Sequence, residues 1–259
     1  MSSSPGFMDR MLKRAVPRPV EGFTPPPFAL GEGLWVLDRR LRHFGMGLLP
    51  SRSTIVRLGN GKLVVVSPPA LLDAETAAAI DALGSVDAAV LPNPFHYVYA
   101  EEFSERYPAA RALAVPGLAE RVPELGAVET LGPDPPVEWA GVLDVELIGP
   151  EGGPYEAMLF HFATGTLILT DVAFNMTEYP RTFDRFFWRL NGLPGKFGPG
   201  RTSRTLLLRD RETASRALAR MLEWPIRRIV VVHGEIVETD AMGALCRAFE
   251  GYLSHGAGS

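Results

Sequence analysis

The most restrictive stretch of the sequence is an apolar run that two prolines cut off. Residues 88–91 have the composition of a buried strand, and Pro92 and Pro94 follow directly. Proline lacks the N–H that a sheet interior requires, so the strand must end and the chain must turn here. His96 comes next, just before a helix-like segment at residues 100–107. An imidazole is therefore expected at the carboxyl end of a strand, where open α/β folds bind ligands.

The segments around this turn alternate between strand and helix composition. The expected strands and helices of this half lie at residues 33–37, 53–58, 62–66, 73–83, 88–91, 100–107, 112–115, 118–122 and 127–131. Gly59-Asn60-Gly61 predicts a hairpin between the second and third strands. From residue 62 onward the order is βαβαβ, which predicts parallel strands joined by helical crossovers.

The second half has a different order of expected elements. We expect antiparallel strands at residues 143–148, 156–162 and 166–171, then a helix at 181–190, a helix at 211–222, a strand at 227–232 and a helix at 241–253. The four large aromatic residues of the first helix are expected to be core and pocket wall: Phe183, Phe186, Phe187 and Trp188. Residues 191–200 are rich in glycine and proline, and we expect a mobile loop close to the site.

Residues 38–50 are basic and interrupted by glycines, which favours a surface loop. Its cluster of Arg39, Arg40, Arg42 and His43 is interpreted as a solvated patch and not as an anion site.

Composition sets the outer limits. The chain has 259 residues, 46% of them hydrophobic, and we expect one domain at residues 28–259 behind a proline-rich arm at 1–27. A net charge of −4 argues against nucleic acid or an anionic membrane as partner. The lone Cys246 cannot form an internal disulfide, and no stretch approaches the ~20 apolar residues of a membrane span. These features favour a cytoplasmic protein, and they leave the oligomeric state undetermined.

Three metal-competent residues stand at predicted strand ends: His96, Asp171 and His233. Two imidazoles and one carboxylate are the minimum set for a single Zn or Fe ion with open positions. The alternative is that the three residues hydrogen-bond to the backbone or to one another and hold no metal. The pattern leaves both interpretations open.

The order of elements, with Thr170-Asp171 and His233-Gly234 at strand ends, resembles the metallo-β-lactamase fold. That resemblance implies an αββα sandwich of two mixed β-sheets flanked by helices. The superfamily's His-x-His-x-Asp-His signature falls on the turn after residue 91, where its four metal residues are replaced by Asn93, Phe95, Tyr97 and Val98. The resemblance therefore implies a degenerate metal site without binuclear chemistry.

The sequence also resembles a narrower group of metallo-β-lactamase-like proteins, which is known as a domain of unknown function and lacks that signature. The matching segments are Ser67-Pro68, Pro92-Asn93 with Phe95-His96, Glu156 with Phe160-His161, residues 166–171 with Asn175, and His233-Gly234-Glu235. This second resemblance implies the fold and no particular activity.

Glu156 and His161 lie five residues apart on one expected strand, so they point to opposite faces and cannot share a site. Glu156 is added to the catalytic candidates, because a carboxylate on an apolar face is paired or functional. Ligand-binding candidates are Asn93, Tyr97, His161 and Asn175.

Two functions remain open. The first is a protein that binds a small molecule or a partner at a degenerate site. The second is a mononuclear metal-dependent hydrolase acting on a small molecule. A nuclease is disfavoured by the acidic charge balance.

Overall fold

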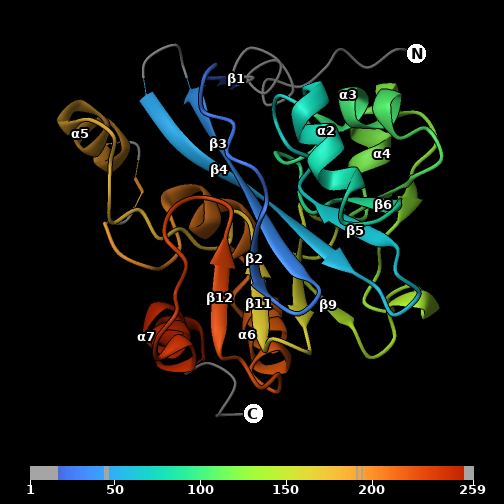
Figure 1. Ribbon diagram of the computed structural model, residues 1–259. Helices are drawn as coiled ribbons and strands as arrows, with labels where there is room; N and C mark the ends of the chain where they lie inside the picture. The colour runs from blue at the N-terminus through green and yellow to red at the C-terminus, as the bar shows by residue number, and fades with distance from the viewer. Residues whose placement is uncertain (1–16, 44–46, 191, 194, 254–259) are drawn as a thin grey trace, which may run out of the picture.

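The computed structural model describes residues 17–43, 47–190, 192–193 and 195–253. Its chain forms two β-sheets that face each other, with helices on the outer side of each sheet (Figure 1). Both sheets contain antiparallel and parallel pairs. The αββα sandwich predicted from the sequence is confirmed.

The first sheet has eight strands in the order β1-β3-β4-β5-β6-β7-β8, with β2 paired to β3. Their bounds are β1 Arg18–Pro19, β2 Phe28–Gly31, β3 Leu34–His43, β4 Gly47–Arg57, β5 Leu63–Val66, β6 Val86–Leu91, β7 Arg111–Ala114 and β8 Glu129–Thr130. The second sheet has the order β12-β11-β10-β9, and its strands are β9 Leu143–Ile148, β10 Glu156–His161, β11 Thr166–Leu169 and β12 Arg228–Val231.

The helices flank both sheets. Their bounds are α2 Ala74–Asp81, α3 Ala100–Arg106, α4 Leu118–Arg121, α5 Thr182–Leu190, α6 Arg211–Met221 and α7 Ala241–Leu253, with short helical turns at Pro123–Leu125, Val137–Trp139 and Ser203–Leu207. In the part of the chain that the structure describes, every helix is too short or too polar to cross a lipid bilayer.

The parallel part of the first sheet follows the predicted βαβαβ order. Strands β5, β6, β7 and β8 pair in parallel, and α2, α3 and α4 form the crossovers. Helix α2 begins where Asp73 accepts a hydrogen bond from the backbone N–H of Thr76, which satisfies one free donor of the first turn. The parallel arrangement brings the carboxyl ends of these strands to one edge.

A long hairpin replaces the expected surface loop at residues 38–50. Strands β3 and β4 pair from Leu34 opposite Val56 to His43 opposite Gly47. The expectation of a loop is wrong, because the main chain of residues 38–43 pairs with that of residues 47–52 although this segment is basic and contains glycines. The solvated patch is also wrong in part: Arg40 and Arg42 are exposed, but Arg39 is only 2% exposed and donates to the carbonyl of Ala70.

The hydrophobic core has one layer between the sheets and one layer outside each sheet. Leu159 and Ile168 of the second sheet pack with Val64 and Val90 of the first. On the outer face of the second sheet, Phe160 and its neighbours pack against α6 and α7. Alternation along β10 thus sends successive residues to different layers, as the period of a strand requires.

The expected N-terminal arm is described from Pro17 onward. Its residues Arg18 and Pro19 pair with β3, so this part contains a short strand where no regular structure was expected. The hydroxyl of Tyr99 donates to the carbonyl of Pro17, which ties the arm to the turn after β6.

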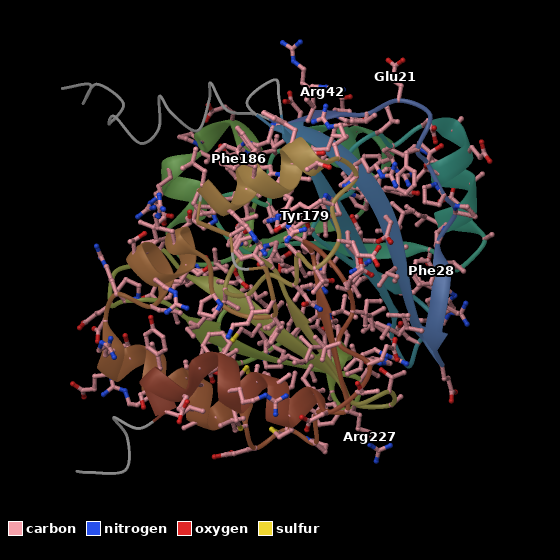
Figure 2. The ribbon with its side chains drawn as sticks, turned by 90° about the vertical axis from the view of Figure 1, so that its left-hand side faces the viewer. Glu21, Phe28, Arg42, Tyr179, Phe186 and Arg227 are labelled. Atoms are coloured by element: carbon pink, nitrogen blue, oxygen red, sulfur yellow. The ribbon has the colours of Figure 1, made fainter. Side chains whose placement is uncertain are left out.

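Helix α5 departs from the expectation that its aromatic residues are core. Trp188 is buried, but Phe183 is 48% and Phe186 68% exposed. Phe186 is labelled on this helix in Figure 2. The helix packs at the outer end of β4, away from the other helices (Figure 1). Only one side of it therefore faces the protein.

Candidate functional site

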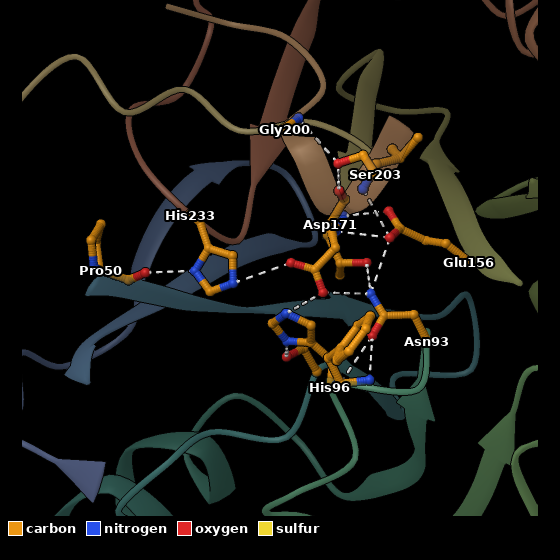
Figure 3. Close-up of polar contacts among 12 residues, drawn as sticks. Pro50, Asn93, His96, Glu156, Asp171, Gly200, Ser203 and His233 are labelled. Atoms are coloured by element: carbon orange, nitrogen blue, oxygen red, sulfur yellow. Dashed lines mark hydrogen bonds and ion pairs between the residues drawn. The ribbon is translucent and has the colours of Figure 1, made fainter. Parts of the chain in front are cut away.

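Three strand ends converge at one edge of the sandwich and bring together His96, Asp171 and His233 (Figure 3). Asp171 Oδ2 lies 3.2 Å from His96 Nε2, and Asp171 Oδ1 lies 3.5 Å from His233 Nε2. One donor atom from each residue can be chosen so that all lie within 4.8 Å of one another. The expected meeting of the two histidines is observed, with ring centroids 5.1 Å apart.

His233 is held by a backbone carbonyl. Its Nδ1 lies 2.7 Å from the carbonyl oxygen of Pro50, which can only accept, so Nδ1 carries a proton. In the neutral ring Nε2 then has a lone pair, and that lone pair faces the Asp171 carboxylate. Two electron-rich atoms at this separation need a proton or a cation between them. A metal-bound histidine is fixed in the same way, by an N–H bond from its other nitrogen.

His96 is held by a hydroxyl. Its Nδ1 lies 2.8 Å from Ser67 Oγ, which can donate or accept. Ser67 is itself fixed, since its backbone N–H donates to Val90 and its carbonyl accepts from Ser53. Its φ of 58° places it in the left-handed region, a costly conformation for a residue other than glycine.

The charges of the cluster are strongly coupled. Burial lowers the pKa of His96, but the attraction of Asp171 more than offsets this and leaves that pKa raised. Burial alone would raise the pKa of Asp171, yet the two imidazoles hold it well below its usual range. Asp171 is therefore a carboxylate at neutral pH, as a metal ligand or an ion-pair partner must be.

Asn93 connects the two halves of the site. Its amide nitrogen lies 3.0 Å from Glu156 Oε2 and 2.9 Å from Asp171 Oδ2, so it separates two buried carboxylates. Its amide oxygen accepts from the backbone N–H groups of Phe95 and His96 at 2.8 and 3.0 Å. The same side chain therefore shapes the turn that presents His96 and orients the carboxylate beside it.

Glu156 is fully buried and fixes the segment that carries Asp171. Its carboxylate accepts from the backbone N–H groups of Thr170, Asp171 and Val172 at 2.9, 2.8 and 3.0 Å. Burial and the charge of Asp171 raise the pKa of Glu156, while the hydrogen bonds from Asn93 and Thr170 lower it. Glu156 thus acts on the site through the backbone of residues 170–172.

Solved structures share this architecture. The DIM-1 metallo-β-lactamase exposed to ceftazidime matches with a TM-score of 0.59 at 15% identity, over 91% of this chain and 98% of that one. FIM-1 from Pseudomonas aeruginosa, a metallo-β-lactamase in its mono-zinc form, matches with 0.57 at 14% identity, over 88% and 96%. The metal-soaked Flv1 flavodiiron core from Synechocystis sp. PCC6803 matches with 0.60 at 14% identity, over 92% and 62%.

The chain has the metallo-β-lactamase fold. No protein-family model matches the sequence, and no curated protein matches it either. At these identities the likeness to solved structures concerns the fold alone.

Within this metallo-β-lactamase fold, the donor set suits one metal ion. His96, Asp171 and His233 provide two imidazole nitrogens and a carboxylate, which Zn and Fe accept. Among the described residues no other group of three or more His, Cys, Asp or Glu side chains converges in this way. The turn after β6, where the signature falls, offers no further imidazole or carboxylate.

The other predicted site residues differ in their positions. His161 is at the opposite end of β10 from Glu156, and its Nδ1 contacts Thr164 Oγ1 at 2.8 Å. Tyr97 is half-buried and packs on the core between the sheets. Asn175 does lie beside the cluster: its backbone N–H donates to the His233 carbonyl, and its side chain donates to the Glu235 carbonyl.

The end of the loop at residues 191–200 reaches the site, although Asn191 and Pro194 lie outside the described residues. Gly198 pairs with Phe174, whose ring stacks on His233 with centroids 5.6 Å apart. Gly200 N–H donates to Ser203 Oγ, and Ser203 donates to the carbonyl of Asp171.

Sequence reasoning missed several residues that hold the site. Arg52 of β4 donates to the carbonyls of Val231 and Gly234, on both sides of His233, and forms an ion pair with Asp38. Ser203 and Pro50 were missed as well. None of these residues carries a local signal, because each meets the site only through long-range packing.

Proposed function

We propose that this protein binds a small molecule at a degenerate metallo-β-lactamase site that takes one metal ion, held by His96, Asp171 and His233. The observation that carries the proposal is the hydrogen bond from His233 Nδ1 to the Pro50 carbonyl. This bond leaves the Nε2 lone pair facing the Asp171 carboxylate, an arrangement that a cation stabilises and a vacant neutral site does not.

The chain's own residues support one ion and no second one. Asn93 stands at the first histidine place of the signature, and its amide is committed to Glu156, Thr170 and Asp171. A second ion beside Asn93 would have to displace these bonds and would find no imidazole there. We therefore infer that binuclear zinc chemistry does not occur.

A single ion at this position would supply Lewis-acid chemistry toward a carbonyl or phosphoryl oxygen of the bound molecule. The residues around it have holding roles. Pro50 and Ser67 orient the two imidazoles, while Asn93 and Glu156 hold Asp171 in place. A mononuclear hydrolase is the activity that follows if the small molecule is cleaved.

A metal-free binding protein is the second candidate, and one observation favours it. The pKa of His96 is raised by Asp171 despite burial, so an imidazolium can take the place of the metal. In that state the carboxylate would bridge two imidazoles, and the site would bind its ligand by hydrogen bonds alone.

Metal content distinguishes the two candidates. The protein is purified without a histidine tag, exposed to Zn and to Fe(II), desalted, and measured by elemental analysis. Asp171→Ala and His233→Ala test the ligands, and His161→Ala is the matched control, since it removes a buried histidine at the far end of β10.

We expect about one ion per chain in the wild type and in His161→Ala, and loss of the ion in both site variants. Addition of the metal should also raise the melting temperature of the wild type and of His161→Ala. It should leave the melting temperature of the two site variants unchanged. Absence of any bound ion in the wild type would favour the metal-free candidate, and two ions per chain would contradict the one-metal proposal.

A further inference from the structure

Helix α5 presents an apolar stripe to solvent. Phe183, Phe186 and Leu190 are 48%, 68% and 65% exposed. They are spaced three and four residues apart, so they lie along one side of the helix. Exposed apolar residues elsewhere, such as Val137, stand singly on other elements. Single exposed residues are normal, whereas three on one helix face require an explanation.

The stripe is not the side by which α5 attaches to the protein. That attachment uses Asp184 and Trp188, which are buried. Asp184 Oδ1 accepts from the Leu48 backbone N–H at 3.0 Å, and Trp188 Nε1 donates to the Leu48 carbonyl at 2.7 Å. A Cβ at Gly47 would lie 2.6 Å from the Phe187 ring, so the helix sits close against the end of the hairpin. The apolar arc of α5 is therefore wider than the part the protein covers.

Positive charge accompanies the stripe. The segment from residue 179 to residue 204 contains six basic residues and one acidic residue, although the whole chain has a net charge of −4. The basic residues are Arg181, Arg185, Arg189, Lys196, Arg201 and Arg204. The acidic one, Asp184, is already paired with Arg181. Arg185 and Arg189 are exposed. Arg189 lies three residues after Phe186 and so borders the stripe, and Arg185 lies one turn before Arg189.

We propose that α5 docks the protein on a lipid surface that carries anionic headgroups. A short helix with phenylalanine and leucine on one side and arginine beside them is typical of a helix that lies in the membrane interface. The aromatic side chains would enter the headgroup and acyl boundary, and the arginines would contact lipid phosphates. This docking concerns the surface of α5 and is independent of the metal site.

The net charge of −4 argues against binding to an anionic membrane, but the charge close to α5 is positive. Screening limits the reach of a charge to about 10 Å at ordinary ionic strength, so a surface meets only the charges near it. A bilayer that approaches α5 is therefore close to the basic residues of segment 179–204. The excess of acidic residues lies outside this segment. The contact is peripheral and requires no spanning helix.

Vesicle co-sedimentation tests the proposal with the full chain. The vesicles consist of phosphatidylcholine alone or of phosphatidylcholine mixed with phosphatidylglycerol. Two double variants alter α5, namely Phe186→Ser with Leu190→Ser and Arg185→Glu with Arg189→Glu. The matched control is Val137→Ser, which removes an exposed apolar residue on another element. Circular dichroism and the melting temperature verify that each variant is folded.

We expect binding to the anionic vesicles, weaker binding at high salt, and a reduction of at least about tenfold in both α5 variants. The control should bind like the wild type. Equal binding by the α5 variants, or no binding by the wild type, would overturn the proposal. So would a dimer that forms without lipid and is lost in the Phe186 and Leu190 variant, because the stripe would then be covered by a second copy.

Discussion

The turn after β6 and the turn after β12 each bring one histidine to Asp171, but they are held in different ways. The first turn, which presents His96, is organised by a side chain within it, since Asn93 accepts from the N–H groups of Phe95 and His96. The second, which presents His233, is held by groups that are distant in the sequence. Arg52 binds two of its carbonyls, and Pro50 fixes the imidazole.

The partners of the two imidazoles differ in a way that decides their protonation. The carbonyl of Pro50 only accepts, so His233 must carry its proton on Nδ1. The hydroxyl of Ser67 can donate or accept, so it accommodates His96 Nδ1 with or without a proton, while His96 Nε2 faces the Asp171 carboxylate at 3.2 Å. In its neutral form, His233 therefore presents a lone pair on Nε2 to the site. The protonation of His96 Nδ1 can change with what occupies the site.

The largest expected effect is that of Asn93→Ala. The change removes the acceptor of the Phe95 N–H and leaves the His96 N–H only its longer bond, 3.3 Å, to the backbone carbonyl of residue 93. It also removes the amide that separates the carboxylates of Glu156 and Asp171. We expect a loss of about 3 kcal/mol in the free energy of unfolding, measured by urea denaturation.

The matched control for Asn93 is Asn60→Ala. Asn60 also accepts from a backbone N–H in a turn, but it is exposed. That change should cost less than about 1 kcal/mol. Equal losses in the two variants would show that the first turn does not depend on its buried side chain.

Arg52→Ala should have the next largest effect, about 2 kcal/mol. It leaves the carbonyls of Val231 and Gly234 without their donor and Asp38 without its ion-pair partner. Hydrogen exchange should accelerate around His233 and remain unchanged around His96. The control is Arg57→Ala on the same strand, whose guanidinium donates to the Leu83 carbonyl at the surface. Faster exchange in both turns would mean that they are not held independently.

Ser67→Ala should cost about 1 kcal/mol, and its informative readout is the tautomer. Nitrogen NMR of the metal-free protein should show a changed proton distribution in the His96 ring. The His233 ring should keep its proton on Nδ1, because Pro50 is unaffected. A change at His233 and none at His96 would reverse the comparison.

The smallest expected effect is a pH dependence near the second turn. Burial and then the neighbouring His233 lower the pKa of His43 to about 4. The unfolded chain binds this proton near pH 6.5 and the folded protein does not, so stability is lost as pH falls between these values. Part of His43 remains in solvent, so screening reduces the effect to less than about 1 kcal/mol between about pH 7 and pH 5.

His43→Gln isolates this contribution, because glutamine does not titrate. The unfolding free energy of the wild type, taken relative to that of the variant, should therefore increase as the pH is raised from about 5 to about 7. A difference that is constant across this pH range would contradict the assignment to His43.

The sequence predicted those parts of the protein that depend on local rules. Periodicity located β9 and α7 at their observed bounds, and Pro92 fixed the end of the strand before His96. His96, Asp171 and His233 became candidates together because each follows the end of a predicted strand. Ligands in open α/β folds bind at the carboxyl ends of the strands. The αββα fold was implied by the resemblance of these elements and strand ends to the metallo-β-lactamase fold.

Tertiary structure alone decided what surrounds them. The β3–β4 hairpin was missed because its pairing is made by the main chain, and glycines and arginines conceal it in the sequence. Pro50 is 183 residues from His233 in the sequence, and Arg52 is 179 and 182 residues from the two carbonyls that it binds. No local sequence pattern indicates contacts at such separations. The exposure of Phe186 was equally hidden, because composition shows that a residue is apolar and only packing shows which side of a helix the protein covers.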